Sequence, residues 1–395
     1  MKRMPSSGPA PLSESDPYTV GTDHWHSLPD GRIQCDVCPR ACRLREGQRG
    51  LCFVRGRVGD QVVLASYGRS SGFCVDPVEK KPLHHFLPGT PVLSFGTAGC
   101  NLGCRFCQNW DISKSREIDT LSGAASPDAL AAVAERLGCR SIAFTYNDPT
   151  VFFEYAADIA QACAARGIRS VAVSAGFMNP KPREEFYRHI DAANIDLKAF
   201  TESFYEKIAF AKLATVLETL EYLRHETSVW LEITTLLIPG HNDSDEELTR
   251  QCAWIAARLG TDVPLHFSAF HPDFKMRDVP PTPPETLHRA RRIARDHGLR
   301  FVYTGNIHDP EGQTTYCPGC GEAVVVRDRY VLNDYRLGDT GECAACGHRL
   351  PGVFDGPAGD WGARRRPIRL APPASRPGPH DRRRPAAENT SKGER

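Results

Sequence analysis

The chain has 395 residues, of which 41% are hydrophobic and 25% charged, and its formal net charge is +1. A chain of this length can bury a large core, and its balanced charge excludes a global attraction to nucleic acid or to an acidic surface. Fifteen cysteines without an apolar leader indicate metal sites rather than disulfides. No apolar run is as long as a membrane span, so we expect a cytoplasmic protein that does not contact membranes.

Both ends of the chain are predicted to be disordered. Residues 1–20 are rich in Ser and Pro, and residues 359–395 are rich in Pro and Arg with almost no apolar periodicity. Such segments bury too little apolar surface to offset the entropy that ordering costs. We expect the basic tail to be a solvated extension, with contact to RNA or an acidic partner as the alternative.

The first cysteine cluster lies in an N-terminal segment, residues 21–90. Its members are Cys35, Cys38, Cys42 and Cys52. Four thiolates can enclose a metal completely, so either a structural zinc or an auxiliary iron-sulfur cluster is expected. The neighbouring Arg40, Arg43 and Arg45 would stabilise negatively charged thiolates. Spacing does not distinguish the two metals, and we favour iron-sulfur.

The second cluster has three cysteines directly after the strand-like run PVLSF. Cys100, Cys104 and Cys107 have the spacing C-x3-C-x2-C. A four-iron cluster takes one thiolate per iron, so three thiolates leave one iron able to bind a small molecule. An open metal position predicts chemistry rather than a scaffold. A zinc loop is the alternative, but zinc normally takes four ligands and nearby histidines are missing.

From residue 91 to residue 308 the chain alternates strand and helix signals. Apolar runs predict strands at 92–95, 141–145, 171–174, 193–197, 229–237 and 265–269. Ser126-Pro127 predicts a helix start, and Gly167 a helix end. Asp243-Ser244 and Pro283-Pro284 predict two further starts. Six such repeats indicate an α/β fold with a parallel sheet, either open and doubly wound or closed as a barrel.

Polar residues follow the predicted strands, at the edge where parallel α/β sheets carry their active sites. They are Asn147, Asp148, Ser174, Gly176, Asp196, Lys198 and His271. Asp196 and Lys198 lie two apart and therefore point to the same side of a strand. A buried acid and ammonium there must pair with each other or bind a polar ligand. For Asp148 the alternative role is a turn that caps the next helix.

The third cluster lies in residues 309–358. Cys317, Cys320, Cys343 and Cys346 form two C-x2-C-G knuckles about twenty residues apart. This spacing predicts a small zinc-ribbon-like module, with rubredoxin-like iron as the alternative because the ligands are the same. Gly321 and Gly347 allow the backbone to turn tightly around the metal.

The motif CRFC, with Phe106 as its aromatic residue, resembles the defining motif of radical S-adenosylmethionine (SAM) enzymes. Together with TYNDPTVFFEY, DAANIDLKAF, LEITTLLIPGHND and HFSAFHPDFKM, it resembles the radical SAM member of the AmmeMemoRadiSam system, a relative of pyruvate formate-lyase activating enzymes. The resemblance extends from about residue 35 to about residue 354. It implies a partial (β/α)6 radical SAM barrel over residues 91–308.

The resemblance also implies roles for the residues that follow the strands. Cys100, Cys104 and Cys107 would hold a 4Fe-4S cluster, while Asn147 and Asp148 would bind the SAM amino group. Asp196 and Lys198 would contact its ribose and carboxylate, and His271 would lie near its adenine. Phe106, Ser174 and Gly176 are further cofactor-binding candidates. The chain departs from the family at Asp148, where the pattern has Glu, and at Ala175 and Phe177, where it has Asn and Tyr.

The implied activity is reductive cleavage of SAM to a 5'-deoxyadenosyl radical, which abstracts hydrogen from a substrate. The substrate is unknown. The resemblance to activating enzymes suggests a glycine residue of another protein. An electron donor such as flavodoxin or ferredoxin, and partners from the AmmeMemoRadiSam system, would be required. A non-catalytic zinc or iron-sulfur binding protein and an electron-transfer protein are the alternatives; both explain the cysteines but not the residues after the strands.

Overall fold

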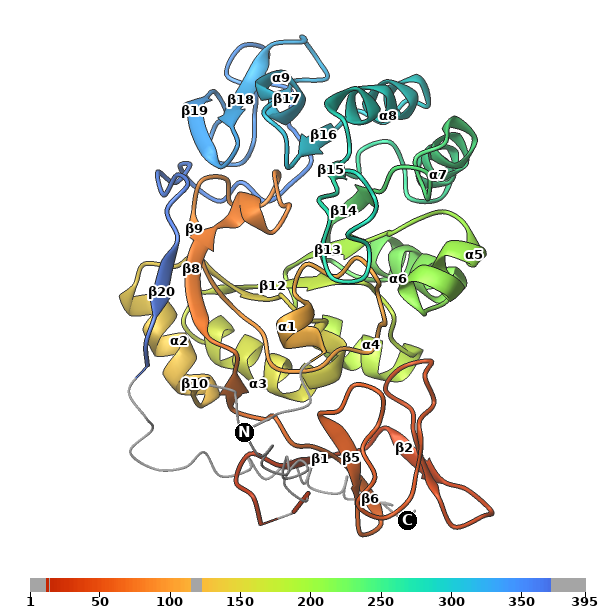
Figure 1. The fold of residues 1–395 in the computed structure, drawn as a ribbon. Coiled ribbons are helices and arrows are strands. Elements are labelled where there is room, and N and C mark those ends of the chain that lie inside the picture. Colours follow the sequence, from red (N-terminus) through yellow and green to blue (C-terminus); the bar gives the residue numbers. More distant parts are fainter. Residues whose placement is uncertain (1–11, 14, 115–122, 371–395) are drawn as a thin grey trace, which may run out of the picture.

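The computed structural model describes residues 12–13, 15–114 and 123–370, and its centre is one mixed sheet. Within these residues the sheet has nine strands in the order β16-β15-β14-β13-β12-β11-β9-β8-β20 (Figure 1). Seven are parallel: β9 (Pro91–Phe95), β11 (Ser141–Phe144), β12 (Arg169–Ser174), β13 (Ala192–Asp196), β14 (Trp230–Leu237), β15 (Leu265–Ala269) and β16 (Val302–Gly305). Every side chain of β11 is buried, as expected for a strand covered on both faces.

The predicted α/β class is confirmed, and all six expected strands are present. The parallel strands number seven rather than six, because β16 forms from the run VYTG, in which only the first two residues are apolar. In the described residues β16 and β20 form the two edges of the sheet, so the sheet is open. This strand order agrees with a partial barrel.

Helices connect the parallel strands, and Figure 1 shows α6, α7 and α8 beside β13, β14 and β15. The longer ones are α2 (Pro127–Arg136), α3 (Phe153–Ala164), α4 (Pro180–Tyr187), α6 (Leu213–Glu226), α7 (Asp245–Arg258) and α8 (Pro284–Asp296). Two expected helix starts are confirmed by N-caps. The Ser126 hydroxyl accepts the Ala129 N–H, and the Ser244 hydroxyl accepts the Glu247 N–H, both at 3.3 Å.

Short elements lie between these units. They are η1 (Val78–Lys80), α1 (Trp110–Ser113), η3 (Pro149–Phe152), α5 (Glu202–Phe204), the π-helical turn η4 (Tyr205–Ala209) and α9 (Pro310–Gln313). A two-stranded ladder joins β7 (Arg69–Ser70) to β10 (Gly123–Ala124). No helix among the described residues is long and apolar enough to cross a membrane.

The N-terminal segment folds as two small antiparallel sheets. One contains β1 (Val20–Thr22), β6 (Gln61–Leu64) and β5 (Arg55–Val58), and the other β2 (Trp25–Ser27), β3 (Ile33–Cys35) and β4 (Arg43–Leu44). The expected disorder of residues 1–20 is wrong at its end. Thr19 is buried, and the Tyr67 N–H donates to the Tyr18 carbonyl at 3.0 Å. Residues 1–11 and 14 lie outside the described part.

The C-terminal module has a three-stranded antiparallel sheet of β17 (Thr315–Tyr316), β18 (Ala323–Asp328) and β19 (Val331–Tyr335). Its small core includes Cys317, Val325 and Phe354.

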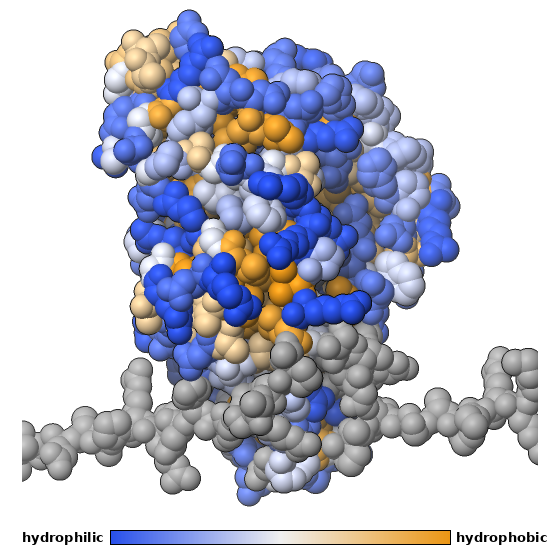
Figure 2. Space-filling model, turned by 90° about the vertical axis from the view of Figure 1, so that its left-hand side faces the viewer, coloured by the Kyte–Doolittle hydropathy of each residue, from blue (hydrophilic) through white to orange (hydrophobic). Residues whose placement is uncertain are grey.

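On the face of the molecule in Figure 2, hydrophobic residues gather in a patch that hydrophilic residues surround.

The expected disorder of residues 359–395 is wrong for its first part. β20 (Arg366–Ile368) pairs antiparallel with β8 (Phe73–Pro77) and becomes an edge strand of the main sheet (Figure 1). Pairing at a sheet edge uses backbone groups and so requires no apolar pattern, and an edge strand tolerates Pro367. Residues 371–395 lie outside the described part of the chain.

Candidate active site

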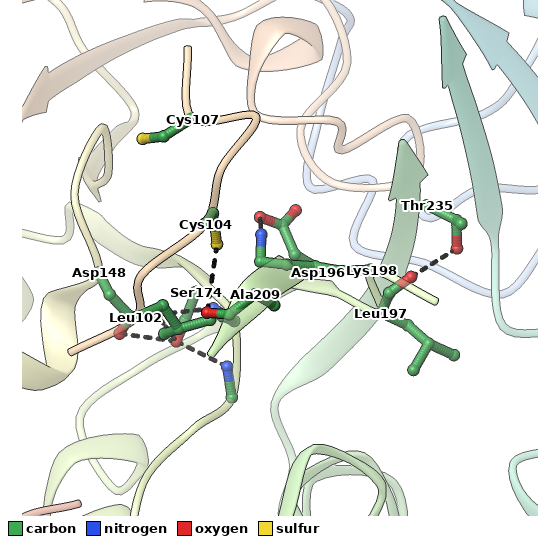
Figure 3. A network of polar contacts seen from close by, with 12 residues as sticks. Leu102, Cys104, Cys107, Asp148, Ser174, Asp196, Leu197, Lys198, Ala209 and Thr235 are labelled. Atoms are coloured by element: carbon green, nitrogen blue, oxygen red, sulfur yellow. Dashed lines mark hydrogen bonds and ion pairs between the residues drawn. The ribbon is translucent and has the colours of Figure 1, made fainter. Parts of the chain in front are cut away.

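The cysteine loop after β9 is held by hydrogen bonds from its own backbone. The Gly103 N–H donates to the Ala209 carbonyl at 2.9 Å, and the Arg105 N–H donates to the Ile208 carbonyl at 3.0 Å. The Cys104 Sγ lies 3.9 Å from the same Ala209 oxygen (Figure 3). The π-helical turn η4 therefore supports the loop and fixes where its central thiol lies.

A second support comes from Asn147, at the end of β11. Its Oδ1 accepts the Thr97 N–H at 2.9 Å, and its Nδ2 donates to the Gly99 carbonyl at 2.8 Å. Gly99 has φ of +77°, and a Cβ there would lie 1.9 Å from the Cys52 carbonyl oxygen. Only glycine fits this contact. The Asn147 side chain thus holds the cysteine loop, and its amide is already used by backbone partners.

Asp148 joins the loops that follow β11 and β12. Its Oδ1 accepts the Thr150 N–H at 3.0 Å, so the helix-capping role is present. Its Oδ2 accepts the Ala175 N–H at 2.8 Å, and the Ser174 hydroxyl donates to the carboxylate at 3.2 Å (Figure 3). Ser174 in turn accepts the Gly176 N–H at 3.0 Å. The carboxylate is therefore positioned by neutral donors on two loops.

Asp196 and Lys198 form an ion pair of 2.9 Å at the end of β13 (Figure 3). The Lys198 Nζ lies 5.7 Å from the centre of the Phe106 ring, in the cysteine motif. Burial alone would lower the pKa of Lys198, but the Asp196 carboxylate and the Cys104 thiolate outweigh burial and raise it. Lys198 is therefore a permanent cation beside the cysteine loop.

One cavity of about 870 Å³ joins most of the predicted residues. Its wall includes Cys100, Cys104, Phe106, Cys107, Asn147, Asp148, Ser174, Asp196 and Lys198. Gly176 and His271 are not among the described lining residues, and His271 is exposed. β15 ends at Ala269, so His271 lies in the loop beyond the strand. The histidines that do line the cavity are His84 and His266.

These two histidines are held by a buried carboxylate. The His266 Nε2 lies 2.7 Å from Glu232 Oε2, and the Glu232 carboxylate also accepts the backbone N–H groups of His84 and His85 at 3.0 and 2.8 Å. Burial lowers the pKa of His84 well below its usual range. Sequence reasoning missed His84 because it precedes the first parallel strand; the only signal was the His-His pair itself.

The cysteine loop has the donors that a four-iron cluster needs. Its three cysteines all line the same cavity, which has room for a cluster and a ligand beside them. Burial raises the pKa of Cys100 to about 12 and also raises that of Cys104, whereas Lys198 and Lys114 act in the opposite direction on Cys104. Thiolates here therefore require a positive partner, which iron and the two lysines would supply.

The N-terminal cysteines surround a second, small cavity that touches the cysteine loop. Its wall includes Cys35, Cys38, Cys42, Cys52 and Asn101. The Arg40 Nε donates to the Asn101 carbonyl at 2.8 Å. These four thiols are not compact enough to meet at one ion, since among the described residues only the C-terminal set lies within 4.8 Å. Burial raises the pKa of Cys35 to about 12, and Arg55 acts against it.

The C-terminal cysteines are arranged for a single ion. Cys317, Cys320, Cys343 and Cys346 have all their sulfurs within 4.8 Å of one another. Burial opposes ionisation of Cys343, yet the N–H groups of Ala345 and Cys346 lower its pKa to about 7. Gly321 and Gly347 have φ of +79° and +76°, as tight knuckles require. Four thiolates in this geometry suit zinc or iron equally.

Comparison with known proteins identifies relatives of the chain. The family model described as the radical SAM superfamily matches residues 95–252, which contain the cysteine loop and the polar residues from Asn147 to Lys198. An uncharacterized protein of Methanocaldococcus jannaschii is 38% identical over 329 residues, covering 82% of this chain and 97% of the relative.

Two solved structures are similar at lower identity. A domain of a pyruvate-formate lyase-activating enzyme from Bacteroides vulgatus ATCC 8482 is 18% identical, covers 42% of this chain and 98% of its own, and has a TM-score of 0.37. A radical SAM methyltransferase from Sphaerobacter thermophilus is 14% identical, with 75% and 76% coverage and a TM-score of 0.45.

Proposed function

Because the chain belongs to the radical SAM superfamily, we propose that it cleaves SAM reductively and uses the product radical to abstract hydrogen from a substrate. The observation that carries this proposal is the single cavity that brings the three thiols of the cysteine loop together with Asp148, Asp196 and Lys198. Each of these groups lies at the carboxyl end of a parallel strand, where α/β enzymes bind their ligands.

Cys100, Cys104 and Cys107 would hold a 4Fe-4S cluster, which supplies the electron that splits SAM into methionine and a 5'-deoxyadenosyl radical. Lys198, kept cationic by Asp196, would bind the SAM carboxylate. The backbone beside Asp148 would receive the amino group. Asn147 would act indirectly, by holding the loop that carries the thiols. His266 would take the adenine-side role that the resemblance assigned to His271.

The activating enzymes that the sequence motifs resemble suggest which substrate the radical would attack. A protein glycine, converted to a glycyl radical, is the leading candidate, and a modified peptide, a small molecule or a nucleic acid is the alternative. A low-potential donor such as flavodoxin or ferredoxin would reduce the cluster. Partners from the AmmeMemoRadiSam system belong to the same proposal and rest on the sequence motifs.

We further propose an iron-sulfur cluster at the N-terminal cysteines and zinc at the C-terminal ones. The wider spread of the N-terminal thiols supports a cluster of several irons, and the compact C-terminal set supports one ion. The N-terminal site touches the cysteine loop twice, through the Cys52 carbonyl beside Gly99 and through Arg40 on the Asn101 carbonyl. A cluster there would be well situated to pass electrons to its neighbour.

Anaerobic reconstitution of the full chain tests these proposals. With dithionite and SAM we expect 5'-deoxyadenosine and methionine without added substrate, and none when dithionite is omitted. Metal analysis should give roughly eight irons and one zinc per chain. Iron without any 5'-deoxyadenosine would favour an electron-transfer protein, and zinc without iron would favour a non-catalytic binding protein.

A further inference from the structure

The cavity wall formed by η1, by the β18–β19 hairpin and by the residue before β20 is rich in cations. We propose that it binds an anionic group of the substrate, a carboxylate or a phosphate, and that Arg329 of the C-terminal module is its main contact. This inference rests on the proposed function, because it assigns the remainder of the cavity that would hold SAM. It also gives the C-terminal module a role in substrate recognition.

The charges at this end do not cancel. Lys80, Lys81, Arg329 and Arg365 all line the cavity, and so does Glu79, whose carboxylate lies 3.9 Å from the buried Arg327. Asp76 binds both lysines, at 3.1 Å and 2.8 Å. Among the described residues no carboxylate lies within 4.0 Å of either Arg329 or Arg365. Arg365 is hydrogen-bonded to the Cys74 thiol, which leaves Arg329 as the guanidinium at the cavity wall that has no acidic partner among the described residues. Guanidinium is the side chain best suited to bind carboxylate or phosphate through two hydrogen bonds.

The backbone at Arg329 supports a role for its side chain. Arg329 lies at the tip of the hairpin between β18 and β19, with φ of +54°. Glycine and asparagine adopt this left-handed conformation far more readily than arginine. The Arg329 N–H donates to Gln313 Oε1 at 2.6 Å, which holds the strained turn in place. An unfavourable residue at a cavity wall is a recognised sign of function. Tyr330, its neighbour, also lines the cavity.

The hairpin is anchored directly to the opposite wall. Arg327, which is fully buried on β18, donates to the Thr315 hydroxyl at 2.9 Å and to the His84 carbonyl at 2.7 Å. The Tyr303 hydroxyl, from β16, lies 2.8 Å from the same Thr315 oxygen. These contacts join the module to β16 and to the His84 wall. The position of Arg329 relative to the cysteine loop is therefore set by a rigid buried network rather than by a free loop.

The test measures binding of pyrophosphate and of citrate to the reconstituted full chain by calorimetry, with SAM saturating so that Lys198 is occupied. Wild-type protein should bind at least one of the two anions, and the preferred one distinguishes phosphate from carboxylate. Arg329→Asn should weaken binding about tenfold or more, because one charged hydrogen-bonding group is lost. Asparagine accepts the left-handed turn, so the variant should keep the wild-type melting temperature.

Arg336→Asn is the matched control. Arg336 is in the same module, exposed and 2.6 Å from Asp334, and it does not line the cavity. Its replacement should leave anion binding unchanged. Absence of binding by wild-type protein, or equal binding by Arg329→Asn, would overturn the inference. SAM cleavage by the same wild-type sample is measured separately, so a protein that cleaves SAM but binds neither anion rejects the anion site alone.

Discussion

Lys198 is the residue where the cysteine loop and the parallel sheet meet. Its ammonium lies against Asp196 and faces the ring of Phe106. The pair is only partly buried, with the Lys198 side chain 13% and the Asp196 side chain 35% exposed, and it lies at the wall of the cavity. Both charges can therefore reach a ligand in the cavity, which favours a ligand-binding role over a structural one. If the pair were purely structural, removing the Lys198 ammonium would leave the affinity for SAM unchanged.

We expect Lys198→Ala to weaken SAM binding roughly tenfold to a hundredfold, since a hydrogen bond to a charged group contributes about 1.5 to 3 kcal/mol. Iron content should not change, because no thiolate is altered. Equilibrium binding of SAM to the reconstituted protein provides the measurement. Lys181→Ala, at an exposed position on α4, is the control. An unchanged dissociation constant for Lys198→Ala would make the pair structural.

Substitutions of Cys104 and Cys343 distinguish the role of the cysteine loop from that of the C-terminal metal site. Cys104→Ser removes one of three thiolates from the loop, so we expect loss of the reduced-cluster signal in electron paramagnetic resonance and loss of 5'-deoxyadenosine. Cys343→Ser damages a separate site and should lower stability while SAM cleavage persists. Normal cleavage by Cys104→Ser would reject the radical SAM assignment. A folded but inactive Cys343→Ser protein would place the C-terminal metal in the reaction.

At the scale of elements, β20 is the part of the fold with the weakest sequence signal. It contributes backbone hydrogen bonds to β8 and one apolar side chain, Ile368, which packs against the core, and it covers a strand that would otherwise be the sheet edge. Since β8 leads into η1, which carries Lys80, β20 also supports one wall of the cavity.

Two truncations test this role. A chain that ends at residue 370 should have the same free energy of unfolding as the full chain, because residues 371–395 are Pro- and Arg-rich and poor in apolar side chains. A chain that ends at residue 365 loses β20 and should be less stable by about 1 to 3 kcal/mol, from the backbone hydrogen bonds that it loses. Denaturant unfolding compares the three proteins. Equal stability of all three would show that β20 adds nothing.

At the scale of the whole molecule, His85 joins the main sheet to the C-terminal module. Its two ring nitrogens lie 2.7 Å from the Pro351 carbonyl and 2.7 Å from the Tyr303 hydroxyl. Its ring packs edge-on against Phe301 and lies 5.8 Å from Phe354. Burial lowers the pKa of His85 to about 4. The His85 side chain is therefore neutral in the folded protein at neutral pH.

This shift predicts how stability depends on pH. The unfolded chain takes up a proton on His85 near pH 6.5 and the folded chain only near pH 4, so the free energy of unfolding should fall as pH decreases through that window. Between pH 7 and pH 5 the loss from His85 should be about 2 kcal/mol. His85→Gln should lose less over this range. Denaturant unfolding at both pH values, with metal content checked, is the measurement; equal losses would contradict the assignment.

Features that depend on short stretches of chain could be predicted from the sequence. The spacing of Cys100, Cys104 and Cys107, the two knuckles of the C-terminal module and the helix starts at Ser126 and Ser244 are local. Cysteine spacing limits which metal can be bound, and a cap is formed within one helical turn. The order of strands and helices followed from apolar periodicity, because a buried parallel strand is apolar along its whole length.

Only the tertiary structure decided which distant residues share the cavity. Arg329 and Arg365 come from parts of the chain far from the cysteine motif, and no local pattern distinguishes them from surface residues. His271 was expected in the site, but it is exposed and lies outside the described lining. β20 escaped prediction because its partner is the edge of a sheet formed elsewhere in the chain. Spacing determines local chemistry, whereas the composition of a cavity depends on long-range packing, which a single sequence does not reveal.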